Sequence, residues 1–177
     1  AFCKFWQEKG YTVVFFKDKY FDGIAGYNAL MLSVDFYKQF IDYEYILISQ
    51  LDALILSNSL DEWLDKDLDY IGPPWISEGK KLKVESAGNG GFSLRRVKAF
   101  MEVLESKKFV VPQNTFVSLP ARAGVLNLLV LRLMILTGSY FKKLNRRALF
   151  LFFFSSNEDL FWSFFAQYFI KYFNVAG

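Results

Sequence analysis

The stretch YEYILISQLDALIL, residues 43 to 56, decides the fold class that we expect for this chain. Its β-branched and apolar residues predict a buried strand that ends at Asp52. A carboxylate in such apolar surroundings costs several kcal/mol of desolvation unless it is paired, hydrogen-bonded or bound to a metal. We therefore interpret Asp52 as part of a site rather than as part of the packing.

The segments on either side of this strand alternate between helical and extended patterns. Further strands are expected at residues 11–16 and 69–72, and helices at residues 1–9, 27–32, 34–40, 60–66, 95–106, 121–137 and 157–170. Strands that alternate with helices are typical of α/β proteins with a parallel sheet. At 177 residues, the chain is long enough for a single domain, residues 1–177, with a core of its own.

Local signals mark the ends of several of these elements. Gly10 is expected to end the first helix, and Ser33 to cap the helix that follows it. Pro73 and Pro74 predict a turn that cannot be a central strand. The polar residues 76–87 predict a surface loop.

The composition of the chain excludes several classes of protein. Hydrophobic residues make up 53% of it and aromatic residues 20%, which excludes a disordered chain. The net charge of +3 comes from short basic patches rather than one long stripe, so nucleic acid is not expected as a partner. The chain has no histidine, which leaves acid–base chemistry to Asp, Glu, Lys or Tyr. Its single cysteine, Cys3, excludes an intrachain disulfide and fits a reducing compartment such as the cytoplasm.

Residues 116–154 form an unusually apolar segment, which we expect to be a helical insertion or subdomain. Its longest apolar runs, residues 124–138 and 148–154, are shorter than the about 20 residues that span a bilayer. The second run is rich in phenylalanine. It fits either a buried core or a surface for an acceptor, a partner or a membrane interface. We therefore expect a cytoplasmic protein, with peripheral membrane contact as an alternative.

Gln50 and Asp52 lie at the end of the expected strand, where open α/β sheets place their ligands. Their side chains point to the same side of an extended chain. A carboxylate and an amide oxygen can hold Mg²⁺ or Mn²⁺ that bridges the phosphates of a nucleotide. Alternatively, Asp52 caps the turn that leads into residues 57–59.

The sequence Asn157-Glu158-Asp159 is expected at the start of the last helix. Acidic residues there complement the helix dipole and cap free amides, which explains them structurally. Alternatively, Glu158 or Asp159 projects into a cleft as a general base, the role that the missing histidines leave open.

Two further segments each have a structural and a functional interpretation. Gly88-Asn89-Gly90-Gly91 fits a plain turn, or a loop whose backbone a ligand approaches closely. Trp75, held on a stiff loop by two prolines, fits either core packing or a platform for a sugar ring.

Several of these motifs occur together in a recognisable order. The series contains YN at residues 27–28, YILI at 45–48, QLDA at 50–53, DYIG at 69–72, PW at 74–75, GNGGFSLR at 88–95, NED at 157–159 and FW at 161–162. Over residues 20 to 165, its order and spacing resemble a family of uncharacterised glycosyltransferase-like domains known only as a domain of unknown function.

The resemblance implies a fold and a donor site. The fold would be the A-type glycosyltransferase fold, a Rossmann-like α/β/α sandwich in which an Asp-x-Asp motif ends a central strand and binds metal and the nucleotide-sugar diphosphate. Gln50 stands at the first position of this motif and Asp52 at the second. Asp52 is therefore the implied metal ligand, while the need for Mn²⁺ or Mg²⁺ is open. Because such domains begin with a strand that would precede Ala1, we expect the chain to be a fragment that lacks its first strand.

The resemblance also implies roles for the remaining motifs. Glu158 and Asp159 are similar to the Glu-Asp pair that inverting enzymes of this fold place near the acceptor hydroxyl. Asp159 is accordingly the expected general base, with Glu158 as the alternate. The other expected donor- or substrate-binding residues are Asn28, Gln50, Trp75, Asn89, Gly90 and Gly91.

Together these expectations describe a glycosyltransferase that moves a sugar from a nucleotide-sugar donor to the hydroxyl of a glycan or another acceptor, in surface polysaccharide or glycoconjugate synthesis. One rival is a non-catalytic nucleotide- or sugar-binding module, which is favoured if Gln50 abolishes metal binding. The other is a domain that binds a membrane surface or a protein partner through its Phe-rich segment.

Overall fold

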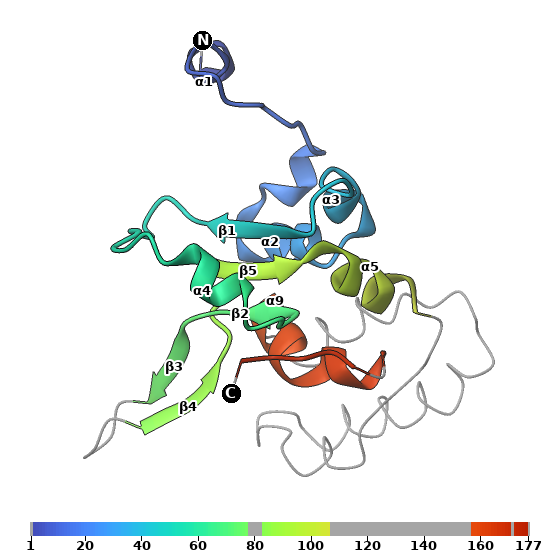
Figure 1. Ribbon diagram of the computed structural model, residues 1–177. Helices are drawn as coiled ribbons and strands as arrows, with labels where there is room; N and C mark the ends of the chain where they lie inside the picture. The colour runs from blue at the N-terminus through green and yellow to red at the C-terminus, as the bar shows by residue number, and fades with distance from the viewer. Residues whose placement is uncertain (1, 78–82, 107–156, 171, 177) are drawn as a thin grey trace, which may run out of the picture.

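The computed structural model describes residues 2–77, 83–106, 157–170 and 172–176 (Figure 1). The helices and helical turns are α1 (Phe2–Glu8), η1 (Asp18–Tyr20), α2 (Gly23–Met31), α3 (Val34–Lys38), α4 (Leu60–Leu64), α5 (Val97–Glu105), α9 (Glu158–Leu160), η2 (Phe161–Phe165) and η3 (Ala166–Tyr168). The strands are β1 (Tyr45–Ser49), β2 (Tyr70–Ile71), β3 (Pro74–Ser77), β4 (Lys83–Ala87) and β5 (Phe92–Arg96). The expected subdomain at residues 116–154, with its helix at 121–137, lies outside the described residues.

β5 is the central strand of a small three-stranded sheet with the order β1-β5-β2. It runs antiparallel to both neighbours, so that Leu94 lies opposite Leu47 of β1 and Arg95 opposite Tyr70 of β2. β3 and β4 pair as a separate antiparallel hairpin. The described part of the chain is therefore mixed α and β. The expectation of parallel pairing is wrong for these strands.

The antiparallel sheet was hard to predict because β5 has no strand-like pattern in its sequence. Ser93, Leu94 and Arg95 are all buried. Polar and apolar residues therefore do not alternate between a solvent-exposed and a buried face of the sheet. The pattern suggested a helix from residue 95, whereas the strand continues to Arg96 and α5 begins at Val97.

Two other elements differ from the sequence prediction. Residues 11–17 form no regular strand, and the side chains of Tyr11 and Phe15 are exposed. In Figure 1 they lead from the body of the molecule to α1, which stands away from it. Pro74 opens strand β3, and residues 83–87 form β4 rather than a loop. Proline is tolerated at the first residue of a strand, which explains why β3 forms in a two-stranded hairpin.

Several local predictions are confirmed. Gly10 follows α1 with a φ of +84°, a backbone conformation that glycine adopts without a steric penalty. The hydroxyl of Ser33 accepts a hydrogen bond of 3.2 Å from the backbone N–H of Phe36, which caps α3. The helices at residues 27–32 and 60–66 are present as α2 and α4.

No helix in the described ranges is both long and apolar enough to cross a membrane.

The core is built around aromatic side chains of α3, α5 and η2. The ring of Phe100 lies 4.0 Å from that of Trp162 and 5.2 Å from that of Tyr37, centroid to centroid. All three side chains are completely shielded from solvent. Close aromatic pairs contribute about 0.5–1.5 kcal/mol each beyond the burial of their surface. This packing holds α9 and η2 against the rest of the fold.

The C-terminal end of the chain is fixed to the sheet by backbone contacts. Tyr70 of β2 forms a parallel bridge with Val175, and the N–H of Asp69 donates to the carbonyl of Asn174 at 2.9 Å. Figure 1 shows this last segment, drawn in red, running beside β2. The chain from α9 onward is thus attached at both ends, to the aromatic core and to the sheet.

Candidate functional site

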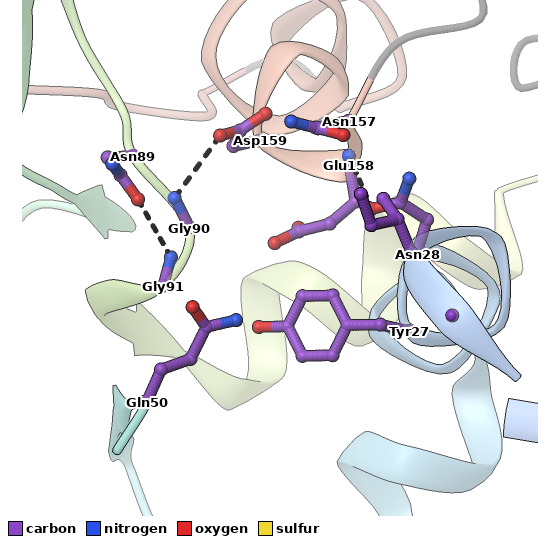
Figure 2. A pocket seen from close by; sticks show the side chains of 11 residues that line it. Tyr27, Asn28, Gln50, Asn89, Gly90, Gly91, Asn157, Glu158 and Asp159 are labelled. Atoms are coloured by element: carbon purple, nitrogen blue, oxygen red, sulfur yellow. Dashed lines mark hydrogen bonds between the residues drawn. The ribbon is translucent and has the colours of Figure 1, made fainter. Parts of the chain in front are cut away.

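A cavity of about 450 Å³ lies between four segments that are distant in sequence. Its size is within the range of about 300–1,000 Å³ that small-molecule sites occupy. Figure 2 shows most of its lining side chains, which converge on one space. The lining residues come from α2 (Gly23, Ile24, Tyr27, Asn28), from the end of β1 (Gln50), from the turn before β5 (Asn89, Gly90, Gly91) and from the start of α9 (Asn157, Glu158, Asp159).

The pairing of β1 with β5 brings the second and third segments together. The last ladder pair is Ser49 with Phe92, and the N–H of Gln50 then donates to the carbonyl of Gly91 at 2.9 Å. Antiparallel pairing therefore places Gln50 directly opposite the glycine turn. Within that turn, the Asn89 side chain accepts a hydrogen bond of 3.0 Å from the N–H of Gly91.

The fourth segment is held against the glycine turn by a buried ion pair between Arg95 and Glu158. Nη2 of Arg95 donates to Oε1 of Glu158 at 2.8 Å, and Nη1 donates to Oε2 at 3.2 Å. Both side chains are almost completely shielded from solvent. Such a bidentate contact is stronger and more directional than a single charged hydrogen bond.

The remaining hydrogen-bond donors of Arg95 are also satisfied. Nε donates to the hydroxyl of Ser93 at 2.9 Å, Nη1 to the hydroxyl of Tyr37 at 2.9 Å, and Nη2 to the carbonyl of Gly90 at 3.1 Å. A buried ion pair is tolerated when its other donors and acceptors are paired in this way. Arg95 therefore connects α3, β5, the glycine turn and α9 into one rigid cluster.

The charges of the pair follow from its surroundings. Burial lowers the pKa of Arg95, but the Glu158 carboxylate more than offsets this and raises the pKa well above its usual value. Burial raises the pKa of Glu158 above its usual value, and the Arg95 guanidinium acts against this rise. Because arginine is a permanent cation in proteins, the bidentate contact keeps Glu158 ionised near neutral pH.

Asn28 fixes the backbone of the same segment. Its side-chain oxygen accepts a hydrogen bond of 3.2 Å from the backbone N–H of Glu158. The side chain of Asn157 makes no capping hydrogen bond. The capping interpretation of the acidic residues holds for Asp159, which accepts from the N–H of Leu160, whereas Glu158 is held by Arg95.

Asp159 differs from Glu158 in having no cationic partner. Its Oδ2 accepts a hydrogen bond of 3.4 Å from the N–H of Gly90, and its Oδ1 accepts one of 2.9 Å from the N–H of Leu160. Among the described residues, no lysine or arginine forms an ion pair with it. Burial raises its pKa above the usual value, although these two backbone donors lower it. The cavity therefore contains one carboxylate that is free to exchange a proton.

Gly90 must be a glycine because of the ion pair beside it. A Cβ atom at this position would lie 2.2 Å from Oε1 of Glu158 and 3.1 Å from Nη2 of Arg95. At Gly91, a Cβ atom would lie 2.5 Å from the side-chain oxygen of Gln50. Both glycines thus leave room for side chains that line or support the cavity.

Tyr27 contributes a hydroxyl that the sequence analysis did not single out. It points into the cavity toward the side-chain amide of Gln50 (Figure 2). The oxygen is buried, and the side-chain amide of Gln50 lies close enough to lower its pKa without reaching full hydrogen-bonding geometry. Burial, followed by the charge of Glu158, raises the pKa of Tyr27, so the hydroxyl stays protonated at neutral pH and can donate.

Seven of the expected site residues line the cavity, and two do not. Those that line it are Asn28, Gln50, Asn89, Gly90, Gly91, Glu158 and Asp159. Trp75 lies on β3 and is not among the lining residues. Asp52 is also outside the lining, because β1 ends at Ser49 and a turn at residues 51–52 interrupts the alternation of side chains.

The apolar stretch around Asp52 is at the surface rather than buried. Leu51, Leu54 and Leu56 are all largely exposed, and so is Asp52. The interpretation that an apolar environment desolvates Asp52 is therefore wrong, because water reaches the carboxylate. In the described ranges, no three Asp, Glu, His or Cys side chains gather to hold a cation. The role of Asp52 as a metal ligand stays a prediction.

Arg95 is the main residue whose role the sequence analysis missed. It ends the GNGGFSLR motif, which was the one signal available, but its pattern suggested the start of a helix. Its partner Glu158 lies 63 positions further along the chain, and no local pattern connects the two.

Comparison with known proteins gives a family and nothing more specific. Neither a curated protein nor a solved structure matches the chain. A family described as "Protein of unknown function (DUF5672)" matches residues 10–177. Since the match extends over nearly the whole chain, the chain belongs to the DUF5672 family.

Proposed function

We propose that this chain is a glycosyltransferase catalytic domain, which transfers a sugar from a nucleotide-sugar donor to an acceptor hydroxyl in surface polysaccharide or glycoconjugate synthesis. The observation that carries the proposal is the convergence of three sequence motifs on one cavity. Gln50 of the QLDA motif, the GNGG turn and the NED sequence all line it. The resemblance of these motifs to those of glycosyltransferase-like domains is the basis for proposing sugar transfer as the reaction.

Asp159 is the proposed general base. Its carboxylate would accept the proton of the acceptor hydroxyl while that oxygen forms a bond to the anomeric carbon of the donor. The bond from the anomeric carbon to the diphosphate oxygen breaks, and the nucleoside diphosphate leaves with the electron pair. The raised pKa of Asp159 supports this role, because a base is most effective when its pKa approaches the working pH.

Glu158 is less suited to that role. Both of its oxygens accept hydrogen bonds from Arg95, and protonating it would break a buried ion pair. We assign it a positioning role, in which it orients the backbone that presents Asp159.

The A-type glycosyltransferase fold remains part of the proposal. It is supported by the position of Gln50 directly after β1 and next to the glycine turn. Mn²⁺ or Mg²⁺ at Asp52 is the corresponding cofactor proposal. Because Asp52 is exposed, such a cation would have most of its coordination completed by the donor diphosphate and water.

Calorimetry with nucleoside diphosphates and nucleotide sugars, with and without Mn²⁺, tests the donor site. We expect at least one nucleotide sugar to bind the native chain, and Asp52→Ala to weaken that binding by tenfold or more when Mn²⁺ is present. The matched control is Asp61→Ala, an exposed carboxylate on α4. Circular dichroism verifies that each variant is folded.

Each outcome of this experiment has a defined meaning. Donor binding that needs Mn²⁺ and Asp52 supports the transferase. Donor binding without any turnover supports the binding module. If the folded chain binds no nucleotide or nucleotide sugar, the transferase proposal is wrong and a partner-binding surface becomes the better account.

A further inference from the structure

We infer that the cavity selects an uncharged sugar ring and rejects anionic ones, with the Tyr27 hydroxyl as a ligand contact. The inference deepens the proposed function, on which it rests for the class of ligand. It depends on the charge of the lining, on the unpaired hydroxyl of Tyr27 and on the amide side chains around it.

The charge of the lining opposes an anion. No lysine or arginine of the described residues lines the cavity. Within the described part of the chain, Arg95 is the cation beside the cavity, and its charge is balanced by the bidentate contact with Glu158. Asp159 forms no ion pair among the described residues, and Arg95 acts on its charge only after burial and two backbone donors. Like charges that share a partly buried site repel strongly because the effective dielectric constant is low.

The polar groups that remain are neutral and suit hydroxyl groups. The Tyr27 hydroxyl and the Gln50 amide lie end to end, and Asn157 lies beside Asp159 (Figure 2). A phenol and amides can donate to or accept from sugar hydroxyls without any charge. A sugar hydroxyl that displaces the Gln50 amide would give the buried Tyr27 oxygen a partner in full hydrogen-bonding geometry, which it lacks among the described residues.

A uronate or a sugar phosphate would instead place its own charge near Asp159. The diphosphate of a nucleotide-sugar donor must then lie outside this cavity. The cavity therefore binds the sugar ring of the donor or of the acceptor. The negative charge of its lining determines that neutral rings bind and anionic rings do not.

Matched pairs of methyl glycosides provide the test. Each pair contains a neutral hexopyranoside and the hexuronide of the same configuration, in the gluco, galacto and manno series, so that its members differ only at C6. Dissociation constants are measured by ligand-observed NMR titration at pH 8 for the native chain and for Asp159→Asn and Tyr27→Phe. Asp61→Asn and Tyr43→Phe, both at exposed positions, are the matched controls.

We expect the neutral member of at least one pair to bind about tenfold or more tightly than its uronide. Asp159→Asn should reduce this ratio to within about threefold, because it removes the repelling charge. Tyr27→Phe should weaken the neutral glycoside about three- to tenfold, the value of one net hydrogen bond. The two control variants should leave every dissociation constant unchanged.

Equal or tighter binding of the uronide by the native chain overturns the inference, and so does the absence of binding in all three pairs. A ratio that Asp159→Asn leaves unaltered also overturns it. The proposed function fails separately: neutral glycosides that bind selectively to a chain without any transfer activity support the cavity and contradict the transferase. If the chain instead transfers a sugar to or from a uronide, the transferase proposal is supported and the selection against anionic rings is contradicted.

Discussion

Arg95 is the residue on which the geometry of the cavity depends most. It makes hydrogen bonds to Glu158, Tyr37, Ser93 and Gly90, and these partners come from four different segments. A single side chain therefore sets the distance between the glycine turn and the start of α9. Removing it leaves a buried carboxylate without a counter-charge, which is among the most destabilising changes known in proteins.

Arg95→Met is expected to lower the free energy of unfolding by about 3–5 kcal/mol, because Glu158 stays buried without its partner. The double variant Arg95→Met/Glu158→Gln should lose less than the single variant, since it also removes the stranded charge. Urea denaturation followed by circular dichroism measures both. A loss below about 1 kcal/mol for Arg95→Met, the size expected of an exposed pair, would contradict a buried ion pair.

The raised pKa of Asp159 leads to a prediction about how the stability of the chain depends on pH. Because burial raises its pKa in the folded chain, the folded state binds the proton more tightly than the unfolded state. The stabilising contribution of Asp159 is therefore complete below its unfolded pKa, about 3.9, and is lost as the pH rises through the raised folded value.

Asp159→Asn, which removes this titration, should become more stable relative to the native chain as the pH rises from acid to neutral. We expect its melting temperature to gain about 1–3 °C on the native value over that interval. Differential scanning calorimetry at several pH values gives the comparison, with Asp61→Asn as the exposed control. A difference that shrinks as the pH rises would mean that the pKa of Asp159 is lowered instead.

Among the elements, α5 and η2 decide where α9 and its carboxylates lie. Phe100 and Trp162 pack ring against ring at the centre of the core, with their planes tilted by 30°, so their contact determines the position of the helical turn that directly follows Asp159. The β1–β5 ladder performs the same task for Gln50 and the glycine turn. Packing of helices and pairing of strands thus build two adjoining walls of the cavity, which meet where the N–H of Gly90 donates to Asp159.

Phe100→Ala tests the contribution of α5. It is expected to cost about 3–5 kcal/mol of unfolding free energy, the usual range for a buried aromatic. Phe15→Ala is the matched control, because the Phe15 side chain is 73% exposed and its loss should cost less than about 0.5 kcal/mol. Equal losses in a urea titration would place residues 11–17 in the core and contradict the described packing.

Elements with local signals could be predicted from the sequence, and those that depend on distant partners could not. The Ser33 cap and the Gly10 turn that follows α1 are set by one or two residues each, and both were predicted. β5 could not be recognised, because both of its faces are buried and its strand partners lie far away in the sequence. Residues 11–16 look like a strand by composition, but no described strand pairs with them.

The residues of the candidate site divide in the same way, into those that a local motif predicts and those that depend on a distant partner. The motifs identified most of the cavity-lining residues, because glycines, amides and carboxylates stand out in an apolar sequence. The Arg95–Glu158 pair could not be found, since it joins residues 63 positions apart. For Asp52, the local pattern itself leads to a wrong prediction. Its apolar neighbours indicate burial, whereas that stretch is exposed in the fold.

At the scale of the whole molecule, the chain brings four distant segments to one cavity, whose carboxylate Asp159 forms no ion pair with the described residues. The sheet supplies the polar amide of Gln50, and the C-terminal segment supplies Asp159. Membership of the DUF5672 family does not specify a reaction. The claim that this cavity performs sugar transfer therefore depends on the chemistry of Asp159.

The most direct test is the turnover of the native chain and of Asp159→Asn, measured as release of nucleoside diphosphate with the donor identified by calorimetry. The account predicts that Asp159→Asn lowers kcat by about 100-fold or more, the contribution of a general base, while donor affinity changes by less than threefold. A kcat within a factor of three of the native value would show that Asp159 is not the base and would contradict the account.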